Sequence, residues 1–266
     1  MKMLSMSLLT VFLSSSACAE VVRVAVASNF RGPMVEIAKR FESESPHELV
    51  ISYGASGKLF AQIVNGAPFD VFLSADKIKP QRLIDLNLAE SNSRITYAFG
   101  RLVLWSPLSS DRSFRDMLRE TDGRIAMANP RLAPYGQAAR ETLATLSLTE
   151  QTRGRWVLGE NIAQTFHFVH SGNAQMGFVA KSQLKDAEGL RGTTWAVEPN
   201  LHSPIAQDAV VLGPAAESVA ARSFIQLLHS EPILELIRRH GYATTIPEPG
   251  MGSDQSQTHL EALDIE

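Results

Sequence analysis

Short apolar runs alternate with amphipathic segments from residue 21 onward, so strands and helices follow one another along the chain. The first run, Val21–Ala27, is apolar and β-branched, as in a strand buried on both faces. In the next segment, Pro33–Phe41, the apolar residues have helical spacing. Strands that alternate with helices in this way predict an α/β protein with mainly parallel sheets and helices on both faces.

The same alternation continues to residue 240. The further predicted strands are Leu49–Tyr53, Asp70–Ala75, Arg124–Ala128, Trp156–Leu158, Met176–Val179 and Thr194–Val197. The further predicted helices are Leu59–Val64, Ile78–Leu86, Phe114–Leu118, Gln137–Leu146, Ile162–His170, Ala215–Leu228 and Ile233–His240. Two long extended stretches, Ile95–Trp105 and Ile205–Leu212, interrupt the pattern and are expected to cross between two sheets. We therefore predict two lobes, with residues 20–99 and 205–247 in the first and residues 100–204 in the second.

Both ends of the chain depart from this pattern. Lys2 precedes a short apolar run and an A-x-A cleavage site that ends at Ala19, so residues 1–19 are predicted to be a signal peptide. The apolar run is shorter than the ~20 residues that span a membrane. Attachment of a lipid to Cys18 is the alternative. Residues 248–266 are polar and rich in Gly and Ser, which predicts a flexible tail.

Composition removes several classes of function. The chain has 266 residues, one cysteine and a formal net charge of −3. No basic field is available to neutralise nucleic-acid phosphates, and one cysteine supports neither a disulfide framework nor a cysteine-based metal site. His167 and His170 lie one helical turn apart, but without a third ligand in view we expect solvated or capping residues. Trp105, Trp156 and Trp195 are expected to lie in the core or between the lobes.

The candidate functional residues lie where a strand is followed by a helix. Ser28 and Asn29 follow the first strand, and Ser56 lies in the turn after the second. Tyr135 and Ile162 stand at the heads of two helices in the second half. Serine and asparagine are common helix caps, which is the simpler interpretation of each junction alone. Several junctions together favour an oxyanion site, because the free N–H groups of helix N-termini bind anions.

The turn Gly54–Lys58 (GASGK) differs from two well-known catalytic loops. Its spacing does not match GxxxxGK[ST], and Lys58 stands where the nucleophile elbow GxSxG requires glycine. A hydrolase with Ser56 as its nucleophile would also need a poised histidine, and no sequence feature nominates one. An exported serine hydrolase therefore remains an alternative, but we expect a binding protein and not an enzyme.

Five segments between Val21 and Tyr242 carry more specific motifs. They are VAVASNF from Val24, YGASGKLFAQIVNGAPFDVFLSAD (Tyr53–Asp76), FGRLVLW (Phe99–Trp105), ANPRLAPYG (Ala128–Gly136) and MGFVAKS (Met176–Ser182). Together they resemble the periplasmic molybdate-binding proteins, the substrate-binding component of the ATP-binding-cassette molybdate importer. The resemblance implies a two-lobed, type II periplasmic binding protein that closes around molybdate or tungstate. It also implies a periplasmic location, a membrane permease as partner and no cofactor; we expect a monomer.

The resemblance also implies which residues bind the anion. They are Ser28, Asn29 and Ser56 in the first lobe, and Tyr135 and the backbone N–H group of Ile162 in the second. One branch of the family carries a tyrosine ligand where this chain has Ala180, so the Tyr135 hydroxyl is expected to replace it. Lys58 and Arg31 lie near the junctions and are expected to steer the anion or to be solvated.

A site built only of donors suits a fully deprotonated tetrahedral dianion. Monohydrogen phosphate would find no acceptor for its proton. Sulfate passes this test, so the size of the cavity must reject it. Another tetrahedral oxyanion, a small carboxylate, and a binding protein without a permease remain alternatives.

Overall fold

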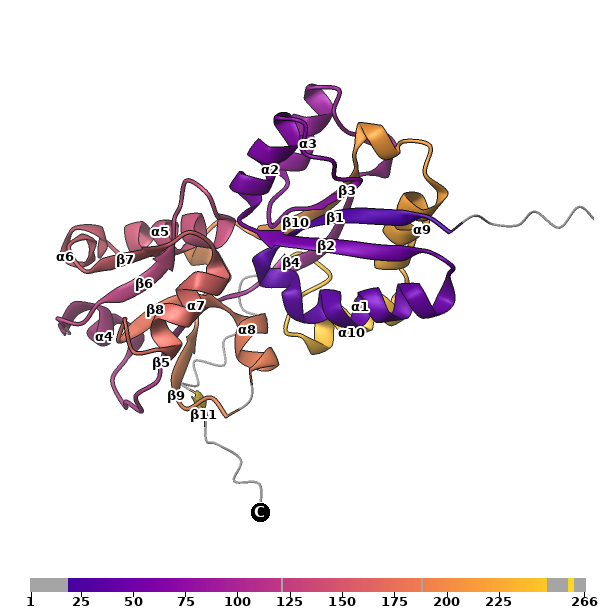
Figure 1. Ribbon diagram of the computed structural model, residues 1–266. Helices are drawn as coiled ribbons and strands as arrows, with labels where there is room; N and C mark the ends of the chain where they lie inside the picture. The colour runs from indigo at the N-terminus through magenta and orange to yellow at the C-terminus, as the bar shows by residue number, and fades with distance from the viewer. Residues whose placement is uncertain (1–18, 121, 188, 248–257, 261–266) are drawn as a thin grey trace, which may run out of the picture.

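The structure is a computed structural model that describes residues 19–247, except 121 and 188, together with Thr258–Leu260. Two sheets flanked by helices form two lobes (Figure 1). Most of the predicted signal peptide, including Cys18, and most of the predicted tail lie outside the described residues. Within the described part of the chain, no helix is long and apolar enough to cross a membrane.

Lobe 1 is built on a five-stranded sheet in the order β2-β1-β3-β10-β4. Its strands are β1 (Val21–Ala27), β2 (Glu48–Gly54), β3 (Val71–Leu73), β4 (Ile95–Gly100) and β10 (Ile205–Val211). Its helices are α1 (Arg31–Glu44), α2 (Ser56–Val64), α3 (Ile78–Asp85), α9 (Val219–Leu228) and α10 (Glu231–Arg239), with 3-10 turns η1 (Ser28–Phe30), η2 (Ser91–Ser93) and η4 (Gly213–Ala215). Strand β1 is parallel to β2 and β3, whereas β10 is antiparallel to β3 and β4.

The sheet of lobe 1 is buried on both faces. Val24 and Val26 belong to an apolar cluster with residues of α1, α9 and α10, while Ala25 belongs to a cluster with residues of α2 and α3. Alternate side chains of a strand point to opposite faces, so the buried part of β1, residues 24–27, is apolar on both faces. Arg23, nearer the start of the strand, is exposed.

Lobe 2 is built on a six-stranded sheet in the order β11-β9-β5-β8-β6-β7. Its strands are β5 (Leu102–Ser106), β6 (Ile125–Ala128), β7 (Trp156–Gly159), β8 (Met176–Ala180), β9 (Gly192–Ala196) and β11 (Thr258–Leu260). Its helices are α4 (Phe114–Glu120), α5 (Pro134–Thr145), α6 (Thr149–Arg153), α7 (Ile162–His170) and α8 (Lys181–Asp186), with the 3-10 turn η3 (Pro199–Leu201). Strand β6 is parallel to β7 and β8, whereas β5 is antiparallel to β8 and β9.

The two-lobed α/β architecture is confirmed, and each sheet contains antiparallel pairs beside its parallel ones. Within residues 19–247 the chain crosses between the lobes twice. In the first crossing, β4 ends at Gly100 in one sheet and β5 begins at Leu102 in the other. The second crossing is residues 197–204, so the stretch Ile205–Leu212, predicted to cross, instead adds β10 to the first sheet. Strands that enter or leave at a crossing run against their neighbours, which makes each sheet mixed.

Several element boundaries differ from the predictions. Helix α9 begins at Val219 and not at Ala215, because the Ser218 hydroxyl caps it by accepting the Ala221 N–H group at 3.0 Å. Helix α5 begins at Pro134, which suits a first turn because proline lacks an N–H group. Helices α6 and α8 were not predicted, and within the predicted flexible tail Thr258–Leu260 pairs with β9 as β11.

Candidate functional site

A small cavity lies between the two lobes, where strands of both sheets end. Its lining residues are Ala27, Ser28, Asn29, Gly54, Ala55, Ser56 and Ala75 of lobe 1 and Ala133, Pro134, Tyr135, Asn161 and Ile162 of lobe 2. All five residues that the sequence nominates as anion ligands are in this lining. The structure therefore brings together positions that are up to 134 residues apart in the sequence, Ser28 and Ile162 being the extremes.

The cavity walls are the first turns of helices. Ser28 begins η1, which leads into α1, and Ser56 begins α2. Tyr135 is the second residue of α5, and Ile162 begins α7. The first N–H groups of a helix have no partner inside it, and the helix dipole places positive partial charge there. Both lobes thus present backbone donors to the same small space.

Most of these helix ends lack a side-chain cap. The residues before η1, α2 and α5 are Ala27, Ala55 and Ala133, and none of them has a capping side chain among the described residues. Helix α7 is the exception, because Asn161 accepts the Gln164 N–H group at 3.0 Å. The simpler interpretation of these junctions as capped helix ends therefore holds for α7 alone. At η1, α2 and α5 no side-chain cap takes up the first N–H groups, although the Gly57 N–H group of α2 bonds to the Leu132 carbonyl.

The two serines keep hydroxyl protons available at the cavity. Ser28 is buried, and its hydroxyl has no hydrogen-bond partner in the described part of the structure. Ser56 is 1 % exposed, and its hydroxyl oxygen accepts the Ala75 N–H group at 3.0 Å. Because the Ser56 oxygen is used as an acceptor, its proton is left to donate. Both hydroxyls therefore suit a ligand that only accepts hydrogen bonds.

The Asn29 side chain turns away from the cavity, in contrast to its predicted role as an amide ligand. Its Nδ2 atom donates to Gln207 Oε1 at 2.9 Å and to Tyr242 Oη at 3.1 Å. The Asn29 carbonyl in turn accepts from Tyr242 Oη at 2.5 Å and from Ser182 Oγ of lobe 2 at 3.2 Å. Both amide hydrogens are thus used within the protein, and Asn29 has its backbone N–H group to offer to an anion.

The Tyr135 hydroxyl is buried beside Gly100, and it has no hydrogen-bond partner in the described part of the structure. A Cβ atom on Gly100 would lie 2.2 Å from Tyr135 Oη and 3.1 Å from Gln207 Nε2, and neither Gly100 nor Gln207 lines the cavity. Burial, with a smaller effect of Tyr242, raises the pKa of Tyr135 well above its usual range, so the hydroxyl stays protonated. Tyr135 itself lines the cavity, and the binding role of its hydroxyl stays a prediction. Ala180 is buried in the same apolar cluster as Tyr135.

None of the residues that the structure places in the cavity lining carries a charge. Lys58 Nζ forms an ion pair with Glu160 Oε1 of lobe 2 at 2.7 Å, and the Arg31 guanidinium lies over the Tyr53 ring, 4.0 Å from its centroid. Both cations are therefore near the site without lining it. The described lining therefore offers an anion only hydrogen-bond donors and helix dipoles.

The other candidate residues from the sequence do not form a site. Among the described residues, no group of three or more His, Cys, Asp or Glu could hold a metal ion. The His170 ring stacks on Phe166 and Trp105, and Trp105 and Trp195 are buried in the clusters of lobe 2. The described cavity lining contains no histidine that could serve as a base for Ser56, so the hydrolase alternative finds no support.

The sequence analysis missed the polar cluster behind the cavity, formed by Gln207, Tyr242, Ser182 and Tyr97. Gln207 Oε1 accepts from Tyr97 Oη at 3.2 Å as well as from Asn29. Gln207 and Asp208 stand inside an otherwise apolar, fully buried strand, β10. A buried polar pair in such a run is the one local signal that could have identified this cluster, because buried polar groups require partners.

Comparison with known proteins agrees with the fold. The sequence profile of the bacterial extracellular solute-binding proteins matches residues 22–243. The chain is 42% identical over 233 residues to the molybdate-binding protein ModA of Azotobacter vinelandii, covering 86% of this chain and 92% of that protein. It is 40% identical to ModA of Rhodobacter capsulatus, covering 87% of this chain and 92% of that protein. The solved structure of the A. vinelandii periplasmic molybdate-binding protein superposes with a TM-score of 0.79 at 35% identity, covering 85% of this chain and 100% of that one. The chain therefore belongs to the bacterial extracellular solute-binding proteins, in the family of the molybdate-binding protein ModA.

Proposed function

We propose that this protein binds molybdate or tungstate between its two lobes in the periplasm and delivers the anion to the permease of an ABC importer. One observation carries the proposal: an uncharged cavity is lined by helix N-termini from both lobes, with the buried hydroxyl of Ser28 unpaired among the described residues. The relatives named molybdate-binding protein support this choice of anion. The proposed role is solute binding without catalysis.

The donor set accounts for the preferred charge state of the anion. Hydrogen bonds to a charged acceptor are worth about 1.5–3 kcal/mol each, so several can offset the dehydration of a dianion. No carboxylate stands in the described lining to accept a proton from monohydrogen phosphate. A protonated anion would therefore bury an O–H group without a carboxylate partner, which costs free energy.

The cavity is small, with ≈ 10 Å³ of space open to the centre of a water molecule, and residues of both lobes line it. An anion held there would contact both lobes. We therefore propose that the anion enters while the lobes are apart and is enclosed as they close.

Binding and closure are coupled because each lobe supplies donors. An anion that contacts both walls gains more free energy in the closed form than in the open form, and so shifts the population toward closure. The closed form is then the state that a permease would recognise. No further observation favours a receptor without a permease.

Isothermal titration of the purified protein with molybdate, tungstate, sulfate and phosphate tests the proposal. We expect one-to-one binding of molybdate and tungstate, and binding of sulfate and phosphate that is weaker by orders of magnitude. Equal affinity for sulfate would show that the protein is a general receptor for tetrahedral dianions. The absence of heat and of any thermal shift with molybdate would refute the choice of anion.

A further inference from the structure

The two lobes meet through their backbones at one point beside the cavity. The N–H group of Gly57, the second residue of α2, donates to the carbonyl oxygen of Leu132 in lobe 2 at 2.8 Å. A Cβ atom on Gly57 would lie 2.9 Å from that oxygen and 3.1 Å from Leu132 Cα. Neither residue lines the cavity, but Gly57 follows Ser56, and Leu132 precedes Ala133, which both do.

The Leu132 side of this contact is held firmly in place. The Asn129 carbonyl accepts from both Leu132 N and Ala133 N at 2.9 Å, and the Asn129 side chain accepts from Arg131 N at 3.0 Å. The N–H group of Asn129 is bonded to the Gly159 carbonyl at 2.7 Å. A turn with this many internal hydrogen bonds cannot shift alone, so a push against Leu132 is passed on to the lobe.

Two other glycines of lobe 1 lie close to side chains of lobe 2. A Cβ atom on Gly32 would meet the carboxylate of Asp186, and a Cβ atom on Gly100 would meet the hydroxyl of Tyr135. In both cases the neighbour is a side chain. At Gly57 the neighbour is the backbone of a turn held by hydrogen bonds.

We propose that the contact between Gly57 and Leu132 is the stop that sets how closely the lobes approach, and that Gly57 thereby determines which size of oxyanion the closed cavity holds. This inference rests on the proposed binding of tetrahedral oxyanions. The stop lies one residue from Ser56 on one wall and three residues from Tyr135 on the other. The distance across it therefore sets the separation of the hydroxyl and N–H donors that must reach a bound anion from both sides.

The variant Gly57→Ala isolates this effect. Gly57 is helical and has no positive φ, and alanine favours helices more than glycine does, so the variant should fold normally. Its methyl group cannot be accommodated against Leu132 unless the lobes stay farther apart. The donors of the two walls then lie farther apart, and a small anion loses more hydrogen bonding than a large one.

The experiment is isothermal titration of wild type and Gly57→Ala with chromate and molybdate, two tetrahedral dianions of increasing size. We expect the affinity for molybdate to fall about tenfold, a change of ~1.4 kcal/mol, and that for chromate to fall further. The ratio of molybdate to chromate affinity should therefore rise. Gly154→Ala is the matched control, because a Cβ atom on Gly154 meets nothing within 4 Å; it should leave both affinities unchanged.

Two results would overturn the inference while leaving the proposed function intact. One is a Gly57→Ala variant that binds both anions as wild type does. The other is an equal loss for both anions, which would mean that the methyl group weakens binding without changing the closed distance. If wild type binds neither anion, the proposed function fails, and this inference fails with it.

Discussion

Two hollows in this protein differ in size, in charge and in whether their polar groups already have hydrogen-bond partners. The larger, of ≈ 360 Å³, lies on lobe 1 between α3, β4 and β10. Its lining residues are Lys77, Gln81, Ile84, Ser91, Arg94, Thr96 and Asp208. The smaller is the uncharged cavity between the lobes. The larger hollow would be the first choice by volume and charge, yet its Arg94 and Asp208 are already paired with each other.

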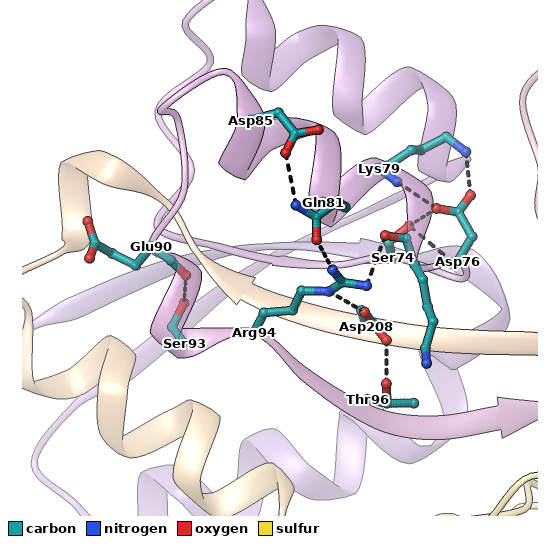
Figure 2. A network of polar contacts seen from close by, with 11 residues as sticks. Ser74, Asp76, Lys79, Gln81, Asp85, Glu90, Ser93, Arg94, Thr96 and Asp208 are labelled. Carbon is teal, nitrogen blue, oxygen red and sulfur yellow. Dashed lines mark hydrogen bonds and ion pairs between the residues drawn. The ribbon is translucent and has the colours of Figure 1, made fainter.

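Figure 2 shows this pairing. Asp208 is 1 % exposed; its Oδ2 atom accepts from Arg94 Nε at 2.6 Å and its Oδ1 atom from Thr96 Oγ1 at 2.7 Å. Arg94 also donates to Gln81 and to the Lys77 carbonyl. Such a network stabilises the fold and leaves few unpaired polar groups that could bind a ligand. Unpaired donors at the end of buried strands, and not volume or charge, distinguish the site between the lobes.

The largest expected effect is a loss of stability from breaking the pair in the larger hollow. Arg94→Leu leaves the buried Asp208 carboxylate without its cation, and removing one partner of a buried pair costs about 3–5 kcal/mol. Arg94 is partly exposed, so we expect the lower end of that range, about 3 kcal/mol. Urea denaturation measures the free energy of unfolding. Affinity for molybdate should stay within about threefold of wild type, and a larger loss would show that this hollow contributes to binding.

Ser28→Ala should lower the affinity for molybdate without lowering the stability of the fold. It removes one hydrogen bond to a charged ligand, worth about 1.5–3 kcal/mol, so molybdate affinity should fall about tenfold to a hundredfold. The free energy of unfolding without ligand should be unchanged or higher, because the hydroxyl has no partner among the described residues. Titration calorimetry and urea denaturation on the same sample separate the two effects. A stability loss as large as that of Arg94→Leu would contradict this assignment of Ser28.

A smaller effect is expected at a charged contact between the lobes, away from the cavity. Asp186 Oδ1 of lobe 2 lies 2.5 Å from His240 Nδ1, and Glu36 Oε1 lies 2.7 Å from His240 Nε2. Burial raises the pKa of Asp186 above its ordinary value, with His240 opposing and Glu36 adding to the shift. The folded protein therefore holds this proton more tightly than the unfolded chain.

The sign of the pH dependence follows. The stabilisation from Asp186 is fully present below the ordinary carboxyl pKa of about 3.8 and is lost as the pH rises through the raised pKa. Urea denaturation between pH 3 and pH 7 should show the free energy of unfolding of wild type falling, relative to Asp186→Asn, across that interval. A difference that is constant with pH would contradict the raised pKa.

The smallest effect is expected for Tyr135→Phe. The Tyr135 hydroxyl lies beside Gly100 and Gln207, which do not line the cavity, so molybdate affinity should change by less than about threefold. Titration of this variant beside Ser28→Ala gives the comparison. If Tyr135→Phe loses as much affinity as Ser28→Ala, the hydroxyl turns toward the anion on binding, and the role predicted for it from the sequence is restored.

The fold was largely predictable because burial leaves a local pattern. Residues 24–27 of β1 are all apolar because both faces of the sheet are covered there, and α1 follows with apolar residues at helical spacing. Boundaries such as that of α9 were less predictable, because a single capping residue, Ser218, decides where the helix begins. The mixed direction of the strands could not be predicted, since it depends on where the chain crosses between lobes.

The strand–helix junctions of the sequence and its family resemblance predicted Ser28, Asn29, Ser56, Tyr135 and Ile162 as anion ligands, and all five line one cavity. Only the tertiary structure decided which atoms of these residues face the cavity. The Asn29 side chain is drawn away by Gln207 and Tyr242, which are 178 and 213 residues farther along the chain. The contact of Gly57 with Leu132 likewise joins two lobes. Local spacing reports the helix turn to which a residue belongs, whereas the direction of a side chain depends on partners that only the folded chain brings near.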